Sequence, residues 1–119
     1  MEEMYLRNYA YLGDAVWELY VRENTVHMTD NAEHLHKITT EKVNAAYQAR
    51  LLQLIRGNLT EEEVELLRRG RNLPIPAGRR QIQNEYRSAT AFEVLIGRWY
   101  TNDKERMKYM FELMNIFKD

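Results

Sequence analysis

Residues 5–23 read YLRNYAYLGDAVWELYVRE and carry the clearest sign of how this chain folds. Apolar side chains recur here three or four positions apart, which is the spacing of the buried face of an α-helix. The stripe consists of Leu6, Tyr9, Leu12, Val16, Leu19 and Tyr20. The stretch therefore predicts a long amphipathic helix near the start of the fold.

The same helical spacing recurs in three later segments. Residues 41–56 form one predicted helix, and Gly57 follows as its stop; its stripe is Val43, Ala46, Tyr47, Leu51 and Leu54. A second runs over residues 81–100, with Ala89, Phe92, Leu95, Ile96 and Trp99 on one face. The last segment carries Met107, Met110, Phe111, Met114 and Phe117. This last stripe is typical of a buried or dimer-forming helix face.

One further helix is predicted from its start signal. Thr60 and Glu63 have the spacing of a capping box, in which each side chain bonds the other residue's backbone N–H. Leu59 and Val64 occupy the positions of a hydrophobic staple, and the three glutamates of the first turn suit the positive end of the helix dipole.

The ends of the predicted helices are marked by glycine, proline and asparagine. The helix that starts after Thr60 is predicted to run to about Arg69 and to end at a left-handed Gly70. Residues 70–80 hold both prolines and form the one long predicted loop. Asn102 and Glu105 predict a second capping box. With no strand-like alternation, repeat or linker, the sequence predicts an all-α fold in a single domain, residues 1–119.

Composition restricts the class of protein further. The 119 residues suit one domain, and a hydrophobic content of 45% with 29% charged residues is typical of a globular chain. No apolar run is long enough for a membrane span, so no membrane partner is expected and a cytoplasmic location is the default. The absence of cysteine excludes disulfides and thiolate metal sites. The net charge of −1 argues against binding nucleic acid with the whole surface.

Two acidic residues stand where a helical core is expected to be apolar. Asp14 lies beside a glycine in the first predicted helix, and Glu93 lies between apolar neighbours. A glycine inside a helix costs about 1 kcal/mol, and an unpaired buried carboxylate costs several. Asp14 could simply neighbour Glu18 on the surface, and Glu93 could pair with Arg87 or Arg98. Alternatively, two carboxylates on packed helices hold a divalent cation, for which oxygen ligands favour Mg²⁺ or Mn²⁺.

The histidines offer no competing zinc site. His27, His34 and His36 lie in one segment, but His34 and His36 are two positions apart and point to different faces of a helix. We expect a structural or solvent-facing role for all three.

A cluster of arginines follows the predicted helix that begins after Thr60. Residues 66–80 contain no acid and five arginines: Arg68, Arg69, Arg71, Arg79 and Arg80. The arginine guanidinium group can form bidentate hydrogen bonds with a phosphate. Arginine side chains at a helix end are, however, often only solvated. Together with a carboxylate metal site, the cluster suggests hydrolysis of a phosphodiester.

Two short motifs carry a family resemblance. Residues 12–16, LGDAV, and residues 92–97, FEVLIG, resemble the two signature segments of the ribonuclease III catalytic domain. More narrowly, the chain resembles Mini-ribonuclease III, the bacterial form without a double-stranded-RNA-binding domain. Four collinear stretches support the narrower match: AYLGDAVWELYVRE (10–23), LHKITTEKVNAAYQA (35–49), LTEEEVELLRRGRN (59–72) and YRSATAFEVLIG (86–97).

The resemblance implies a function and a set of site residues. It implies an α-helical domain in a two-fold dimer, with Asp14 and Glu93 as catalytic acids that bind Mg²⁺. Each site then cuts one strand of double-stranded RNA and leaves 5′-phosphate and 3′-hydroxyl ends, and precursor 23S ribosomal RNA is the implied substrate. The RRGRN run, in the part of the family that meets RNA, corresponds to Arg68, Arg69, Arg71 and Asn72. Arg79 and Arg80 extend the expected RNA contact, and a ribosomal protein is a further candidate partner.

The chain also departs from the full-length enzyme pattern. Additional acids of that pattern, before the aspartate and before the glutamate, are replaced here by Arg7, Ala10 and Thr90. Ala10 and Thr90 match the Mini-ribonuclease III version of the site, which predicts fewer protein ligands for a metal. Residues 73–80, LPIPAGRR, differ from the small, polar, lysine-containing loop of that subfamily, so details of substrate choice are not carried over.

Two alternatives of another class remain. A catalytically silent ribonuclease III-like domain could bind structured RNA or a ribosomal protein, but its mark is loss of the two acids, and both are present. A helical protein-interaction module would use the Met107–Phe117 stripe as its partner surface.

Overall fold

The computed structural model describes residues 4–75 and 83–117, and within these ranges it contains helices and no strand. The elements are α1 (Leu6–Thr25), α2 (Ala32–Val43), α3 (Ala45–Ile55), the short 3₁₀ turn η1 (Arg56–Asn58), α4 (Glu61–Arg71), α5 (Gln83–Asn102) and α6 (Lys104–Met114). The predicted all-α fold is confirmed. Among the described helices, none combines the length and the apolar character needed to cross a lipid bilayer.

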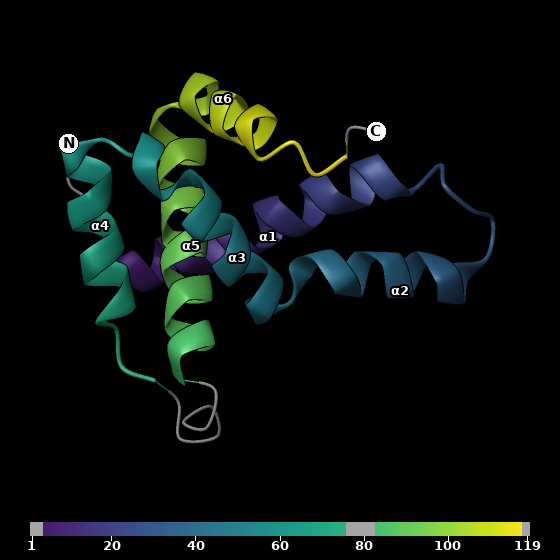
Figure 1. Cartoon of the computed structure of the whole chain (residues 1–119), viewed down its shortest axis with the longest axis horizontal. Helices are drawn as coiled ribbons and strands as arrows, with labels where there is room; N and C mark the ends of the chain where they lie inside the picture. Colours follow the sequence, from purple (N-terminus) through teal and green to yellow (C-terminus); the bar gives the residue numbers. More distant parts are fainter. Residues whose placement is uncertain (1–3, 76–82, 118–119) are drawn as a thin grey trace.

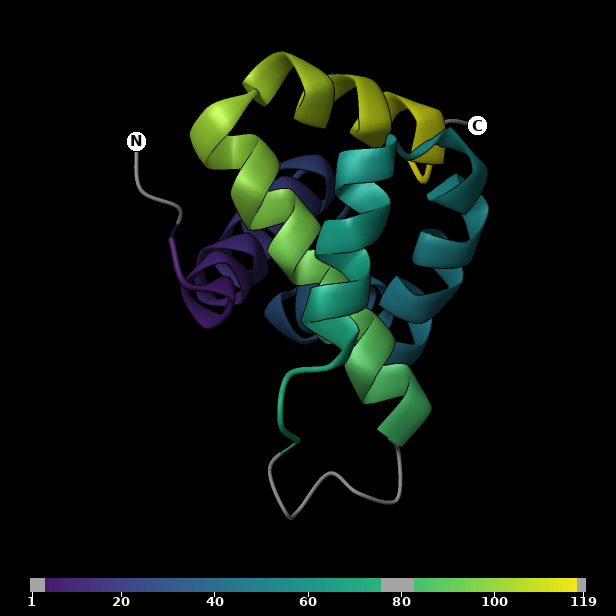
Figure 2. The ribbon, with the colours of Figure 1, turned by 90° about the vertical axis from the view of Figure 1, so that its left-hand side faces the viewer.

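The fold is organised around α5. Helices α1, α3, α4 and α6 all pack against it, and its contact with α1 is the most extensive. In Figure 1, α1 crosses behind α5 while α4 runs alongside it. Figure 2 shows α6 lying across the end of α4 and α5, so the central helix is covered on several sides. Phe92, Leu95 and Ile96 on α5 are consequently fully buried.

Two glycines allow α1 and α5 to touch backbone to backbone. A Cβ atom on Gly13 would lie 1.9 Å from the carbonyl oxygen of Glu93, and one on Gly97 would lie 2.0 Å from the carbonyl oxygen of Tyr9. No side chain larger than hydrogen fits either position without separating the helices. The glycine next to Asp14 is therefore explained by close approach of the backbones.

Aromatic rings fill the core beside this crossing. Trp17 packs edge to face on Phe92, with centroids 5.2 Å apart, and on Phe111 at 5.4 Å. Its indole N–H donates to the carbonyl oxygen of Lys42 at 2.8 Å and so links α1 to α2. The apolar stripe predicted for α1 was wrong in part, because Leu19 is 58% exposed and the buried side chain is Trp17.

The helix predicted over residues 41–56 is two helices that meet at Asn44, and α2 was not foreseen. The Asn44 side chain accepts a hydrogen bond from the Tyr47 N–H at 2.9 Å, which starts α3. Its amide also donates to the Thr40 carbonyl oxygen at 3.1 Å, which closes α2. One asparagine thus caps both helices, and its extended backbone breaks the run. The buried face of α3 is shifted accordingly, and Leu54 is exposed.

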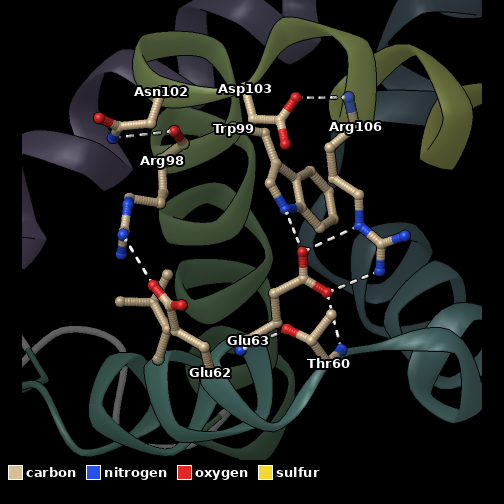
Figure 3. A pocket seen from close by; sticks show the side chains of 9 residues that line it. Thr60, Glu62, Glu63, Arg98, Trp99, Asn102, Asp103 and Arg106 are labelled. Atoms are coloured by element: carbon tan, nitrogen blue, oxygen red, sulfur yellow. Dashed lines mark hydrogen bonds and ion pairs between the residues drawn. The ribbon is translucent and has the colours of Figure 1, made fainter.

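The start of α4 forms as predicted and is tied to two other helices. Thr60 and Glu63 make the capping box, with bonds of 2.9 and 3.1 Å. The Glu63 carboxylate also accepts from Trp99 at 2.7 Å and from Arg106 at 2.8 Å (Figure 3). Burial opposes ionisation here, but the hydrogen bonds from Arg106, Thr60 and Trp99 outweigh it and lower the pKa of Glu63. Val64 is exposed, so the staple predicted with Leu59 is not a buried contact.

Two other predicted helix ends were wrong. Gly70 does not end α4 in a left-handed conformation, since no glycine in the described ranges has a positive φ. It lies inside the helix, where a Cβ would come within 3.1 Å of the Ala91 Cα, so close packing on α5 explains it. At the start of α6, Asp103 rather than Asn102 is the cap, and it accepts from the Arg106 N–H at 3.1 Å.

The C-terminal apolar stripe belongs to the core. Met110, Phe111 and Met114 are buried, and Met107 and Phe117 pack against the same cluster. This arrangement removes the basis for a partner-binding groove on that face.

We expect Gly13→Ala to destabilise the protein by about 3 kcal/mol or more, because the added methyl group overlaps the backbone of α5 and α1 must move away. Thermal or urea unfolding measures the loss. Gly57→Ala is the matched control, since nothing lies within 4 Å of a Cβ at Gly57. Equal stability of the two variants would contradict the close approach of α1 and α5.

Candidate active site

The structure brings Asp14 and Glu93 together at the crossing of α1 and α5. Asp14 follows Gly13, whose missing side chain lets the backbone of Glu93 approach. The two carboxyl groups are in hydrogen-bond contact, and Asp14 is exposed while Glu93 is largely covered. Two carboxyl groups that are far apart in the sequence thus form one acidic pair with one open side.

The alternative partners of these acids are engaged elsewhere. Glu18 pairs with Arg22 at 3.1 Å. Arg98 pairs with Glu62 at 2.9 Å, and Arg87 donates to the Arg71 carbonyl oxygen at 2.6 Å. No arginine contributes to the pKa shift of Glu93. The structure therefore does not support the interpretation of Glu93 as half of an ordinary ion pair.

The acidic pair holds a proton at neutral pH when no cation is bound. Burial first, and then repulsion by Asp14 and the hydrogen bond between the two carboxyl groups, raise the pKa of Glu93 to about 8. The Gln48 amide acts in the opposite direction. A protonated carboxyl beside an ionised one is the usual outcome when two carboxylates share a site. A cation can replace that proton and remove the repulsion.

The donor set fits a hard divalent cation that completes its ligands from water and substrate. Mg²⁺ is commonly held by one or two carboxylates together with waters and phosphate oxygens. Residues 4–75 and 83–117 contain no cluster of three or more His, Cys, Asp or Glu side chains that could enclose a metal. His27, His34 and His36 are all exposed.

A third residue of this site was missed by the sequence analysis. Gln48 of α3 is only 2% exposed, and its Nε2 makes no hydrogen bond of normal geometry to any described residue. The Gln48 amide nevertheless lies close enough to Glu93 to influence its pKa. An unsatisfied buried donor costs about 1–3 kcal/mol. The signal was present in the sequence, because Gln48 shares the buried helical face of Leu51, Leu52 and Ile55.

The predicted RNA-binding arginines are not equivalent in the structure. Arg68 forms an ion pair with Glu65, and Arg71 is half-buried, with its guanidinium donating to the Ser88 hydroxyl. Arg69 and Asn72 are exposed at the end of α4. Arg79 and Arg80 lie outside the described residues.

A separate hollow of about 390 Å³ lies between α4, α5 and α6 (Figure 3). Four of its charged groups are paired, Glu63 with Arg106 and Glu62 with Arg98, and Asp103 accepts a hydrogen bond from the Arg106 N–H. Neither Asp14 nor Glu93 lines it. We therefore regard this hollow as part of the helix packing and the acidic pair as the candidate active site.

Comparison with known proteins identifies the family. The profile of the Ribonuclease III domain matches residues 7–104. A Mini-ribonuclease 3 from Gloeobacter violaceus is 41% identical over 109 residues, which cover 92% of this chain and 81% of the relative. A Mini-ribonuclease 3 from Desulfitobacterium hafniense is 39% identical over 121 residues, or 98% of this chain and 75% of the relative. A crystal structure of a Fusobacterium nucleatum protein matches with a TM-score of 0.85 at 32% identity, covering 98% and 96% of the two chains.

The fold and these matches define a ribonuclease of the ribonuclease III type, and the chain belongs to the ribonuclease III family. The family consists of endoribonucleases that act on double-stranded RNA and generally use divalent metal ions. Within it, the relatives of this chain are the Mini-ribonuclease 3 enzymes, as the sequence motifs predicted.

The raised pKa of Glu93 predicts how the metal-free protein responds to pH. The usual carboxyl value is 4.5 and the folded value is about 8, so the folded state binds the proton more tightly. This contribution to stability is fully present below about pH 4.5 and is lost as the pH rises through about 8. We expect the melting temperature in EDTA to fall between pH 6 and pH 9, and to fall less in Glu93→Gln.

Glu105→Gln is the control for this experiment, because Glu105 is an exposed acid on α6. It should keep the wild-type dependence on pH. Parallel melting curves for the wild type and Glu93→Gln would show that Glu93 has an ordinary pKa.

Proposed function

We propose that this chain is a divalent-metal-dependent endoribonuclease that cuts double-stranded RNA, with Asp14 and Glu93 as its metal-binding carboxylates. The observation that carries the proposal is the contact of these two carboxyl groups at the α1–α5 crossing, in a chain of the ribonuclease III family. Mg²⁺ is the proposed cofactor, and Mn²⁺ is its substitute. The presence of both acids disfavours a catalytically silent RNA-binding domain.

The two acids have different tasks in this proposal. Asp14 and Glu93 would hold a divalent cation, which would supply positive charge that favours ionisation of water and offsets the charge that develops on the phosphodiester. Glu93 is largely covered by neighbouring helices, so its carboxyl group has little freedom to turn. Asp14 is exposed and faces the side from which an RNA phosphate can approach. Binding of the cation would displace the proton that the pair shares in the metal-free protein.

RNA contact comes from the surface of the same domain in this proposal. Double-stranded RNA is recognised mainly by shape, through phosphates and 2′-hydroxyl groups. Arg69 is exposed and is therefore the first candidate for a phosphate contact, with Arg68, Asn72, Arg79 and Arg80 beside it in the sequence. Arg71 is bonded to Ser88, so its first task is to hold the end of α4 against α5. We propose that the whole chain, residues 1–119, is one catalytic domain.

The resemblance to Mini-ribonuclease III supports the finer points of the proposal. They are a two-fold dimer whose two sites cut the two strands, 5′-phosphate and 3′-hydroxyl products, and precursor 23S ribosomal RNA as the substrate. A dimer doubles the RNA-binding surface and matches the antiparallel strands of a duplex. Such a substrate places the enzyme in the cytoplasm, and a ribosomal protein is a candidate accessory partner.

We expect Asp14→Asn and Glu93→Gln each to lower the cleavage of duplex RNA by more than about a hundredfold, because each removes one proposed metal ligand. Cleavage of a labelled duplex in Mg²⁺ and in EDTA measures the effect, and circular dichroism checks that both variants are folded. Glu18→Ala is the matched control, since this acid lies one turn beyond Asp14 and pairs with Arg22. Metal-dependent cleavage at the wild-type rate by either variant would refute the assignment.

We expect Arg69→Ala to weaken RNA binding and to reduce the slope of log K against log salt by about one unit, as for the loss of one phosphate contact. Binding is measured in EDTA with the Asp14→Asn protein, so that no RNA is cut. Arg56→Ala is the control, because Arg56 is exposed near the start of α4, away from Arg69. An unchanged slope in Arg69→Ala would mean that this arginine is only solvated.

A further inference from the structure

We propose that Gln48 is a positioning residue of the active site: its side-chain amide holds the Glu93 carboxylate in the orientation that binds the divalent cation. The inference rests on the proposed metal site and assigns it a residue from a third helix. The unpaired atom of Gln48 is its donor Nε2, which a cation cannot use as a ligand, so the inference assigns Gln48 an effect through Glu93.

The first observation is the burial of an unpaired donor. Gln48 is 2% exposed and lies on the face of α3 that packs against α5. Its Nε2 is the one buried side-chain nitrogen or oxygen without a hydrogen bond among residues 4–75 and 83–117. Buried polar groups are nearly always hydrogen-bonded, so a donor left without a partner in the core points to a role in another state of the protein.

The second observation is that the Glu93 carboxyl group lies next to the Gln48 amide. The Gln48 amide is near the Glu93 carboxyl, and its effect favours the ionised form of that carboxyl. An amide Nε2 can only donate, and an ionised carboxylate can only accept. The Glu93 carboxylate of a cation-binding site is therefore an acceptor within reach of the otherwise unpaired Nε2. Carboxylates that bind metals are regularly fixed by such hydrogen bonds from their surroundings.

A purely structural glutamine would behave differently when it is replaced. Methionine has nearly the same length and no donor, so Gln48→Met removes an unsatisfied group and keeps the packing. If Gln48 acts only on the metal-bound state, this variant keeps its stability without metal and loses metal affinity. If Gln48 serves the core, the variant loses stability and binds metal as the wild type does.

The test uses Mn²⁺ as the probe, followed by the loss of the free-ion signal in electron paramagnetic resonance, on the full chain without RNA. We expect Gln48→Met to bind Mn²⁺ about 10–100-fold more weakly than the wild type and to melt in EDTA at the same or a higher temperature. Cleavage of duplex RNA should need a correspondingly higher Mn²⁺ concentration. Gln53→Met is the matched control on the exposed face of α3 and should change neither property.

The outcomes separate this inference from the proposed function. The role of Gln48 alone is overturned if Gln48→Met binds Mn²⁺ as tightly as the wild type does. It is also overturned if both Gln48→Met and Gln48→Leu melt at a lower temperature than the wild type in EDTA. The proposed metal site, and the Gln48 inference with it, is overturned if the wild type does not bind Mn²⁺. The same holds if Asp14→Asn binds Mn²⁺ as tightly as the wild type does.

Discussion

The contact of two bare backbones, at Gly13 on α1 and Gly97 on α5, is the constraint on which the site depends. Helices that approach this closely bring short side chains beside the crossing into direct contact. Asp14 follows Gly13, and the Glu93 carbonyl oxygen is the atom that Gly13 faces, so the carboxyl groups of these two acids meet. The rest of the fold serves the same contact, because α3, α4 and α6 pack around α5 and keep it in place.

The distribution of charge along α4 is more informative about RNA binding than the net charge of the chain. A net charge of −1 argues against a nucleic-acid-binding surface, yet α4 carries three glutamates in its first turn and three arginines in its last. One of the glutamates, Glu63, is used to tie α4 to α5 and α6. A sum over the chain cancels these two ends, although an approaching RNA backbone would meet them separately. Net charge thus described the average surface and not the end of α4.

The sequence was sufficient for the helical class and for singling out two acids that the structure brings together, because helix periodicity and an acid among apolar neighbours are local signals. The sequence was insufficient for predicting helix ends and buried faces where a single residue contacts two helices. Asn44 ends α2 with its side-chain amide N–H and starts α3 with its side-chain carbonyl oxygen, so the apolar pattern continued across a break. Gly70 was expected to end a helix, but it is needed for close packing on α5. Gln48 was not predicted as a site residue because the apolar stripe expected for α3 did not include its position. The packing of α3 on α5 shows that Gln48 lies on the buried face.

If Asp14 and Glu93 are the only protein ligands of the proposed cation, the site depends on its substrate in a particular way. Two carboxylates leave most positions around a Mg²⁺ ion to water and to phosphate oxygens. In the proposed enzyme a phosphate oxygen of the RNA would therefore supply one of the remaining ligands, and substrate and cation would strengthen each other's binding. Such a site depends strongly on how well its two protein ligands are oriented, since no third acid among the described residues corrects a misplaced one. Glu93 is half-buried and lies near the Gln48 amide, whereas Asp14 is exposed, and in the proposed enzyme this exposed acid is the one that RNA can approach.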